Sequence, residues 1–532
     1  MTDLGMHEIV IDLMTEPAGV PRARAMMARA QWAARSFRTY DKSALDRILS
    51  AVARAGAENA AKYAEWAVAE TGFGVVEHKI LKNVACSTGL IETYRNHDYV
   101  TPRFDSTSKI VEVPRPAGVV LALTPSTNPV ATVYFNCLLA LMTRSVVIVS
   151  PHPMAKEVCA DAARTLAKAA VAAGAPDGVI QVVDQPSVPL INALMTDRRT
   201  DVIVATGGSA VVHAAYSSGT PALGVGPSNV PVFVDATADL AAAAKRIVDS
   251  KSFDNSILCT NESVLIVEEQ VVEQLLRHMK MAGAYLLDGK ERDRVRDLIF
   301  PGGHFDVAWV GKDASTIAAA AEVRVPANTK ILLAPFDFVV REEPFAHEKL
   351  CPVLGLVRVK SAARGIEAAR GVLRIAGRGH SASIHSNDPA TVMSYGAAVD
   401  VLRVTVNVGN SLGSSGIETN LPPSMTIGTG YVGRSSVGEN LQPKHLVQWT
   451  RLAYNADNVV EFPSFFGLNP WESPVGPIPP YPVASNAQHT NRPSTKTSTP
   501  TVRREPLSTE SVALREEIRR LVAEELERYA KD

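Results

Sequence analysis

Residues 146–176 read VVIVSPHPMAKEVCADAARTLAKAAVAAGAP and place a short β-branched run directly before a long Ala-rich segment. The same alternation extends over residues 111–265, where further β-forming runs are VVLALTP, VIVATGG, VPVFVD and SVLIVEE. Short apolar runs that alternate with helical segments are typical of βαβ units around a buried parallel sheet. This part of the chain therefore predicts a doubly wound α/β domain.

The flanking segments differ in composition from this stretch. Residues 20–100 have apolar side chains at helical spacing and predict a helical opening. Residues 300–410 alternate again, with ILLAPF, VLGLVRV, SASIHS and RVTVNV as candidate strands, and predict a second α/β domain. After Trp471 the chain is rich in Pro, Ser and Thr, which predicts a flexible linker. A charged helix follows, with an apolar stripe made of Leu514, Ile518, Leu521, Val522, Leu526 and Tyr529.

Bulk properties exclude several classes of function. The chain has 532 residues, 46% of them hydrophobic, and a net charge of -1, so it lacks the basic excess that nucleic acid or anionic lipid would require. Its five cysteines are scattered, and no His, Asp or Glu group has metal-ligand spacing, so we expect neither disulfides nor a metal. There is no basic segment before an early apolar run and no stretch long enough for a membrane span. We expect a cytoplasmic protein.

Three polar segments are candidates for chemistry. Cys259 lies in KSFDNSILCTNE just before a β-forming run, which places a thiol at a strand edge, although many cysteines only fill cores. Asn128, in LALTPSTNPV, follows a strand end and could donate to an oxyanion or merely cap the turn. The turn at Thr206, Gly207 and Gly208 leads into a helix whose N-terminus could face a pyrophosphate, but such turns also serve packing alone.

Together these segments resemble the aldehyde dehydrogenase superfamily, and more narrowly its coenzyme A-acylating branch. The resemblance extends over about residues 20–460 and includes SSGTPALGVGPSNVPVFVD, HEKLCPVL, GRGHSASIH and PPSMTIGTGYVGRSSVGENLQPKHL. It implies that Cys259 is the nucleophile, Asn128 the oxyanion amide and His380 a histidine that assists proton transfer. The cofactor-binding positions that we expect from it are Thr124, Pro125, Ser150, His152, Thr206, Gly207, Gly208, Gly224 and Glu348.

Two departures from the hydrolytic members bear on the reaction. Where those members have a glutamate that activates water, this chain has Gly224 at about that position, which favours attack by the coenzyme A thiol over attack by water. A lysine that often contacts the adenosine ribose is matched here by Ser150, with His152 two residues on. The choice between NAD and NADP therefore stays open, and NAD is favoured only because it is commoner in the acylating branch.

The resemblance implies an aldehyde dehydrogenase-like α/β fold with a Rossmann-type cofactor domain, a second α/β catalytic domain and small oligomerisation strands. We expect a homodimer or homotetramer. The expected boundaries are 1–234 for the helices and cofactor domain, 235–420 for the catalytic domain, 421–471 for the C-terminal return and oligomerisation segment, 472–507 for the linker and 508–532 for the amphipathic helix.

The expected reaction is oxidation of a small aldehyde to its acyl-coenzyme A through an acyl-cysteine thioester. Propionaldehyde or acetaldehyde is favoured, with lactaldehyde and sulfoacetaldehyde as alternatives. The tail at 508–532 resembles peptides that bind a shell protein and carry enzymes into the lumen of bacterial microcompartments, although a self-pairing helix is an alternative. The rival functions are a hydrolytic dehydrogenase that makes the free acid and a non-catalytic scaffold.

Overall fold

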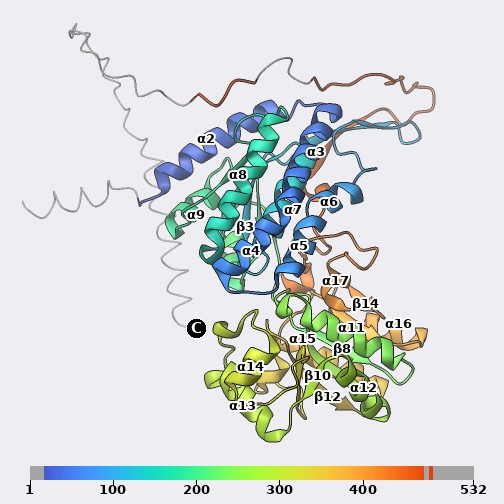
Figure 1. Ribbon diagram of the computed structural model, residues 1–532. Coiled ribbons are helices and arrows are strands. Elements are labelled where there is room, and N and C mark those ends of the chain that lie inside the picture. Colours follow the sequence, from blue (N-terminus) through green and yellow to red (C-terminus); the bar gives the residue numbers. More distant parts are fainter. Residues whose placement is uncertain (1–16, 473–477, 483–532) are drawn as a thin grey trace, which may run out of the picture. The chain divides into compact units, whose positions relative to one another are not determined.

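The structure is a computed structural model that describes residues 17–472 and 478–482 (Figure 1). These residues belong to one compact unit, Met1–Pro482. It contains two parallel sheets and a small antiparallel sheet, which confirms the predicted α/β class. In the described ranges, none of the helices combines the length and apolarity that a bilayer crossing requires. The predicted amphipathic helix at 508–532 lies outside the described residues.

The predicted helical opening is confirmed. Its helices are α2 (Val20–Phe37), α3 (Lys42–Glu58), α4 (Ala60–Thr71), α5 (Val76–Ala85) and α6 (Thr88–Thr93). Local sequence sets their ends: the Asp41 side chain accepts a hydrogen bond from the Ala44 N–H at the start of α3, and α4 ends at Gly72 in the left-handed conformation.

The first parallel sheet has five strands in the order β5-β4-β3-β6-β7. Its strands are β3 (Val119–Thr124), β4 (Val146–Pro151), β5 (Ile180–Val182), β6 (Val202–Ala205) and β7 (Ala222–Gly224). The helices between them are α7 (Pro129–Met142), α8 (Lys156–Ala172), α9 (Val188–Thr196) and α10 (Ser209–Ser217). Every residue of α7 is buried, because this helix packs against both β3 and α3, and its sequence is accordingly apolar on all sides.

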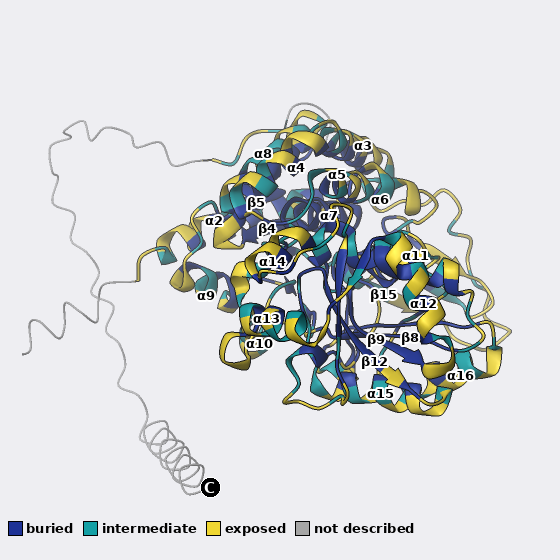
Figure 2. Cartoon of the chain, turned by 60° about the horizontal axis from the view of Figure 1, so that its bottom comes forward, coloured by how far each residue is buried: buried dark blue, intermediate teal, exposed yellow. Residues whose placement is uncertain are grey.

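The second parallel sheet has seven strands in the order β10-β11-β12-β9-β8-β13-β14, and its central strands β8, β9 and β12 are buried except at Arg358 of β12 (Figure 2). Its strands are β8 (Val230–Val234), β9 (Glu262–Glu268), β10 (Ala284–Leu286), β11 (Ile331–Pro335), β12 (Val353–Val359), β13 (Ala382–His385) and β14 (Val404–Val406). Its helices are α11 (Leu240–Ser252), α12 (Glu269–Ala282), α13 (Gly289–Ile299), α14 (Ala314–Ala320), α15 (Ala362–Ile375), α16 (Pro389–Ala398) and α17 (Asn410–Ser414).

One predicted boundary needs correction. The prediction assigned VPVFVD to the cofactor domain, which was to end at residue 234, but β8 pairs with β9 and β13 in the middle of the second sheet. The first sheet ends with β7, so the two sheets separate within residues 225–229. A buried β-branched run predicts a strand but does not say which sheet the strand joins, and this explains the error.

The antiparallel sheet consists of β1 (Arg103–Asp105), β2 (Ile110–Pro116) and β15 (Val447–Ala453). The chain after β15 returns over the opening helices. The Phe465 ring stacks on Phe104, and the Trp471 indole N–H donates to the Val100 carbonyl at 2.7 Å. In the segment predicted as a linker, the Tyr481 ring contacts Trp32 on α2 with 5.7 Å between centroids, so this part of the described residues 478–482 lies against the opening helices.

Candidate active site

Cys259 lies in a loop between a short 3-10 helix, η2 (Phe253–Ser256), and β9. The three residues 254–256 all have positive φ, of 49°, 53° and 66°, although none is glycine. Such backbone conformations cost energy and gather at functional loops. Of the five cysteines, four are buried and Cys259 is partly exposed. Cys259 is thus the one of the five cysteines whose residue retains some exposure, and it lies just before β9.

Asn261 holds this loop from within. Its side-chain oxygen accepts hydrogen bonds from the Lys251 ammonium at 2.5 Å and from the Ser256 hydroxyl at 2.8 Å. Its amide nitrogen donates to the Leu258 carbonyl at 2.6 Å. The polar neighbours of Cys259 thus fix the loop's shape. Lys251, which is completely buried, was missed because its place on the α11 periodicity gave no sign of this contact.

The pKa of the Cys259 thiol is raised to about 12. Removal from water is the main cause, and the nearby Glu348 carboxylate raises it further. Its own main-chain N–H and the Arg403 guanidinium act in the opposite direction. In the free protein the thiol is therefore protonated at neutral pH, and attack on a carbonyl requires that its proton be removed.

The structure brings Glu348 into the environment of Cys259. Burial raises the pKa of its carboxyl to about 7, although a hydrogen bond from the Ser228 hydroxyl and the charge of Lys251 lower it. Burial also lowers the pKa of Lys251 to about 8. Glu348 is thus a carboxyl that can exchange a proton near neutrality.

His380 is also connected to this loop. Its Nδ1 lies 3.0 Å from the Ser381 hydroxyl, which accepts from the Asn410 amide, and that amide donates to the Thr260 carbonyl at 2.7 Å. Its Nε2 is buried and has no hydrogen-bond partner among the described residues. Burial, assisted by the charge of Arg403, lowers the pKa of His380 to about 3. Its ring is therefore neutral but only weakly basic.

Asn128 precedes α7, but its side chain makes no capping hydrogen bond. Its side-chain oxygen instead accepts a hydrogen bond from Lys82 on α5, and the same ammonium contacts the Asp254 carboxylate in η2. The structure thus connects Asn128 to the loop that ends in Cys259. Lys82 and Lys79, one turn apart on α5, were missed because the helical pattern of residues 20–100 predicted only packing.

Eight of the nine predicted cofactor positions lie at the carboxyl ends of the strands of the first sheet, and the ninth, Glu348, lies before β12 of the second sheet. Thr124 ends β3 opposite Pro151 of β4, and Gly224 ends β7 opposite Ala205 of β6. The remaining predicted positions of this group lie at or next to these ends, at Pro125, Ser150, His152, Thr206, Gly207 and Gly208. This edge of a doubly wound sheet is where such folds bind ligands.

The start of α10 fits a phosphate group. Gly208 is its N-cap residue and no side chain caps the helix, which leaves main-chain N–H groups available. An added Cβ at Gly208 would meet nothing within 4 Å, so the turn borders open space. The chain thus offers donors and room for a pyrophosphate at this turn.

Gly224 is closely packed. Its N–H donates to the Tyr216 hydroxyl at 2.9 Å, and its carbonyl accepts from the Ser435 hydroxyl at 2.6 Å. An added Cβ would lie 2.8 Å from both the Tyr216 ring and Val212. A carboxylate side chain therefore does not fit here without displacement of α10.

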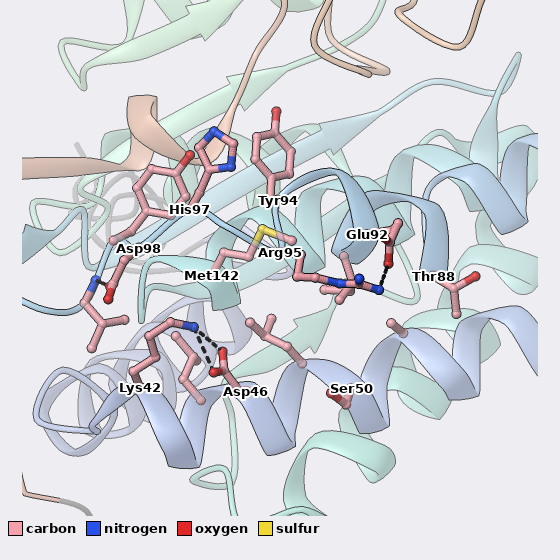
Figure 3. A pocket seen from close by; sticks show the side chains of 16 residues that line it. Lys42, Asp46, Ser50, Thr88, Glu92, Tyr94, Arg95, His97, Asp98 and Met142 are labelled. Carbon is pink, nitrogen blue, oxygen red and sulfur yellow. Dashed lines mark hydrogen bonds and ion pairs between the residues drawn. The ribbon is translucent and has the colours of Figure 1, made fainter.

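Two hollows differ in their relation to these residues. A hollow of about 450 Å³, between α3 and residues 88–100, contains the ion pairs Lys42–Asp46 and Arg95–Glu92 and none of the predicted site residues (Figure 3). A second, of about 680 Å³, is lined by residues that include Phe253, Asn255 and Leu412. It therefore reaches the beginning of the loop that holds Cys259.

Comparison with known proteins identifies the family of this chain. Residues 14–298 match the model of the aldehyde dehydrogenase family. The bifunctional aldehyde-alcohol dehydrogenase of Escherichia coli is 38% identical over 447 residues, which cover 83% of this chain and 50% of that protein. The chain thus spans about half the length of the first curated relatives that it matches.

Two solved structures are similar over most of their own length. An acetylating aldehyde dehydrogenase from Geobacillus thermoglucosidasius has a TM-score of 0.81 and 36% identity, with 83% of this chain and 98% of that chain covered. A propionaldehyde dehydrogenase from Rhodopseudomonas palustris, with bound CoA and an acylated cysteine, has a TM-score of 0.74 and 28% identity, with 81% and 97% covered. The chain belongs to the aldehyde dehydrogenase family.

Proposed function

We propose that this protein oxidises a small aldehyde and transfers the acyl group to coenzyme A. The observation that carries the proposal is the pairing of a presented thiol, Cys259, with a Gly224 position that has no room for a water-activating carboxylate. The two solved relatives support the choice of coenzyme A as acceptor, since one is named acetylating and the other holds CoA beside an acylated cysteine.

In this mechanism the Cys259 sulfur attacks the aldehyde carbonyl carbon after its proton has been removed. The Cys259 main-chain N–H and the Asn128 amide nitrogen donate to the oxyanion that forms. When bound, NAD or NADP supplies the acceptor for the hydride that leaves this carbon. Cys259 is then an acyl thioester, and the coenzyme A sulfur displaces it to give acyl-coenzyme A and the free thiol.

The chain's residues suggest how protons and the cofactor are handled. Glu348, with its pKa near neutrality, is the better candidate for receiving the Cys259 proton, because His380 is a weak base. The uncapped N-terminus of α10 at Gly208 would hold the cofactor pyrophosphate. NAD is favoured over NADP on the resemblance alone.

A second candidate function is hydrolysis to the free acid. It is favoured by one observation: Glu348 is a carboxyl near Cys259 that could activate water in place of the glutamate that is absent at Gly224. The retained nucleophile loop and glycine turn speak against a scaffold without activity.

Among substrates, propionaldehyde is favoured, and the propionaldehyde dehydrogenase from Rhodopseudomonas palustris supports it. Acetaldehyde, lactaldehyde and sulfoacetaldehyde remain alternatives. We further propose a homodimer or homotetramer formed through the antiparallel sheet, whose strand β15 exposes Leu452 and continues into the exposed Tyr454. Delivery into a microcompartment through a shell protein that binds residues 508–532 is a proposal from sequence alone.

Absorbance at 340 nm tests the main proposal. Purified protein with propionaldehyde and NAD should form reduced cofactor continuously only when coenzyme A is present, and the Cys259→Ala variant should form none. Steady turnover without coenzyme A would establish the hydrolytic reaction instead. A repeat with NADP, and then with the other aldehydes, compares the cofactors and substrates under the same conditions.

A further inference from the structure

A buried charge cluster lies between helix α5 and the loop that precedes Cys259. Lys79 and Lys82 are one turn apart on α5 and their side chains are 4% and 1% exposed, while the Asp254 side chain in η2 is fully buried. The Asp254 carboxylate accepts from both ammonium groups and from the Val75 N–H at 2.6 Å. Two cations thus share one anion inside the protein.

Such a cluster is weak evidence of a stabilising role. Burial of charge is costly, and buried ion pairs often contribute no more to stability than apolar residues of the same size. Burial is also the main reason that the pKa of Lys79 is lowered to about 8. Asp254 itself has a φ of 49°, so the loop adopts a strained conformation while making these contacts.

Lys82 differs from Lys79 in one contact. Its ammonium also donates to the side-chain oxygen of Asn128. The Lys82 ammonium thus contacts both the Asn128 amide and the carboxylate of Asp254, which lies five residues before Cys259. The Lys79 ammonium instead donates to the Thr127 carbonyl at 3.3 Å, the backbone atom next to Asn128 and not its side chain. The two lysines therefore share Asp254 but not Asn128.

The contact with Lys82 decides how the Asn128 amide is oriented. An ammonium group has only donors, so the amide must turn its oxygen toward Lys82 and its nitrogen away. The amide nitrogen donates one long hydrogen bond, of 3.4 Å, to the Thr127 hydroxyl. Within residues 17–472 and 478–482 its second N–H has no partner, so it can donate to a ligand. A preoriented donor of this kind needs no rearrangement when negative charge develops on the substrate.

We propose that Lys82 is a positioning residue that orients the Asn128 amide toward the oxyanion and, through Asp254, holds that amide in register with the Cys259 loop. The inference rests on the proposed function, in which Asn128 is an oxyanion donor. Lys82 itself does not touch the substrate.

The test is a double-mutant cycle on the burst of reduced cofactor in the first turnover, which precedes transfer to coenzyme A. Asn128→Ala should slow the burst roughly 100-fold, as loss of one oxyanion donor does. Lys82→Met keeps the length of the side chain and should slow the burst by about tenfold or more. The loss should appear mainly in the burst rate at saturating NAD and not in the apparent affinity for NAD. The double variant should be no slower than Asn128→Ala alone, because residues that act as one unit are non-additive.

Two further measurements separate positioning from general support of the fold. Lys79→Met, the matched control, should slow the burst less than Lys82→Met does. Alkylation of Cys259 by iodoacetamide needs no oxyanion donor, so Lys82→Met should alkylate within about twofold of the parent protein. If Lys82→Met does not fold, Lys82→Gln replaces it, because glutamine both donates and accepts and so no longer dictates the orientation of the amide.

Each contrary result has a distinct meaning. Losses that multiply in the double variant, or an equal loss in Lys79→Met, would overturn the inference, as would alkylation that slows in parallel with the burst. A normal burst in Lys82→Met beside a slow Asn128→Ala would overturn the inference and leave the proposed function intact. A normal burst in Asn128→Ala would remove the oxyanion role on which both depend.

Discussion

The Gly224 main-chain N–H donates to the Tyr216 hydroxyl at 2.9 Å, so the position that lacks a carboxylate is occupied by a phenol ring from α10. The same hydroxyl accepts from the Ser436 N–H at 3.1 Å. The Tyr216 hydroxyl is therefore held by two main-chain N–H groups, those of Gly224 and Ser436. Under the proposed function, the close packing at Gly224 leaves no room for a water-activating carboxylate, and introduction of one should require more than one substitution.

Gly224→Glu is accordingly expected to lose activity with coenzyme A at least tenfold and to gain no turnover without it, because the new side chain would overlap Tyr216 and Val212. Absorbance at 340 nm with and without coenzyme A measures both quantities. Gly289→Glu, at a position where an added Cβ meets nothing within 4 Å, is the matched control and should retain the parent rate. Steady turnover of Gly224→Glu without coenzyme A would contradict the steric argument.

Alkylation of Cys259 should depend steeply on pH. Since the pKa of this thiol is about 12, the thiolate fraction and the iodoacetamide rate should rise about tenfold per pH unit from pH 6 to 9 without a plateau. In Glu348→Gln the nearby negative charge is gone, the thiol pKa falls, and the rate at a given pH should increase. The four buried cysteines should react slowly, and Cys259→Ser measures that background. A plateau below pH 8 would show a much lower pKa than the structure implies.

Asp254→Asn should destabilise the protein by about 3 to 5 kcal/mol at pH 7, because it leaves two buried lysines without an anion. Although burial raises its pKa, Lys82 and Lys79 hold the pKa of Asp254 below its usual value. The contribution of the Asp254 carboxylate to the free energy of unfolding is therefore fully present above about pH 4. It is lost as the pH falls through the pKa of Asp254 in the folded state. The gap in thermal midpoint between parent and variant should shrink in acid.

The exposed Lys42–Asp46 pair provides the control for this measurement. Asp46→Asn should change stability by no more than about 0.5 kcal/mol at pH 7, since exposed ion pairs contribute little. An equal loss in the two variants would mean that burial of the Asp254 cluster has no special cost.

His380 should not titrate in the working pH range. With its pKa lowered to about 3 by burial and Arg403, the ring is neutral from pH 5 to 9. The ratio of parent to His380→Gln rates, measured as kcat/KM for the aldehyde, should therefore be constant over this range, whatever the size of the loss. A ratio that changes severalfold between pH 5.5 and 7.5 would mean that His380 titrates near its ordinary value.

The sequence predicted the strands better than their assembly. Runs such as VPVFVD and RVTVNV became β8 and β14 because a buried parallel strand is apolar on both faces and so stands out from its surroundings. Their sheet partners depend on contacts far apart in the chain, which local patterns do not record. For this reason the boundary at residue 234 was placed a few residues too late.

The same limit applies to the site. Polar residues beside Cys259 and Asn128 marked the two loops, because such residues are unusual beside a buried strand. Lys82 and Lys251 gave no comparable signal, since a lysine on an amphipathic helix is usually solvated. Lys82 is buried against Asp254 and Asn128, and Lys251 against Asn261 and the Lys349 carbonyl, and these contacts between distant residues are set only by the three-dimensional arrangement.

The connection between the two parallel sheets is made by residues 225–229, and it does more than join them. Ser228 in this connection donates to Glu348, and the Asn229 amide donates to the Ala346 carbonyl at 2.9 Å. The Ser228 hydroxyl lowers the pKa of the Glu348 carboxyl, and the Glu348 carboxylate raises the pKa of the Cys259 thiol. The segment that joins the two sheets therefore also bears on the protonation of the nucleophile's surroundings.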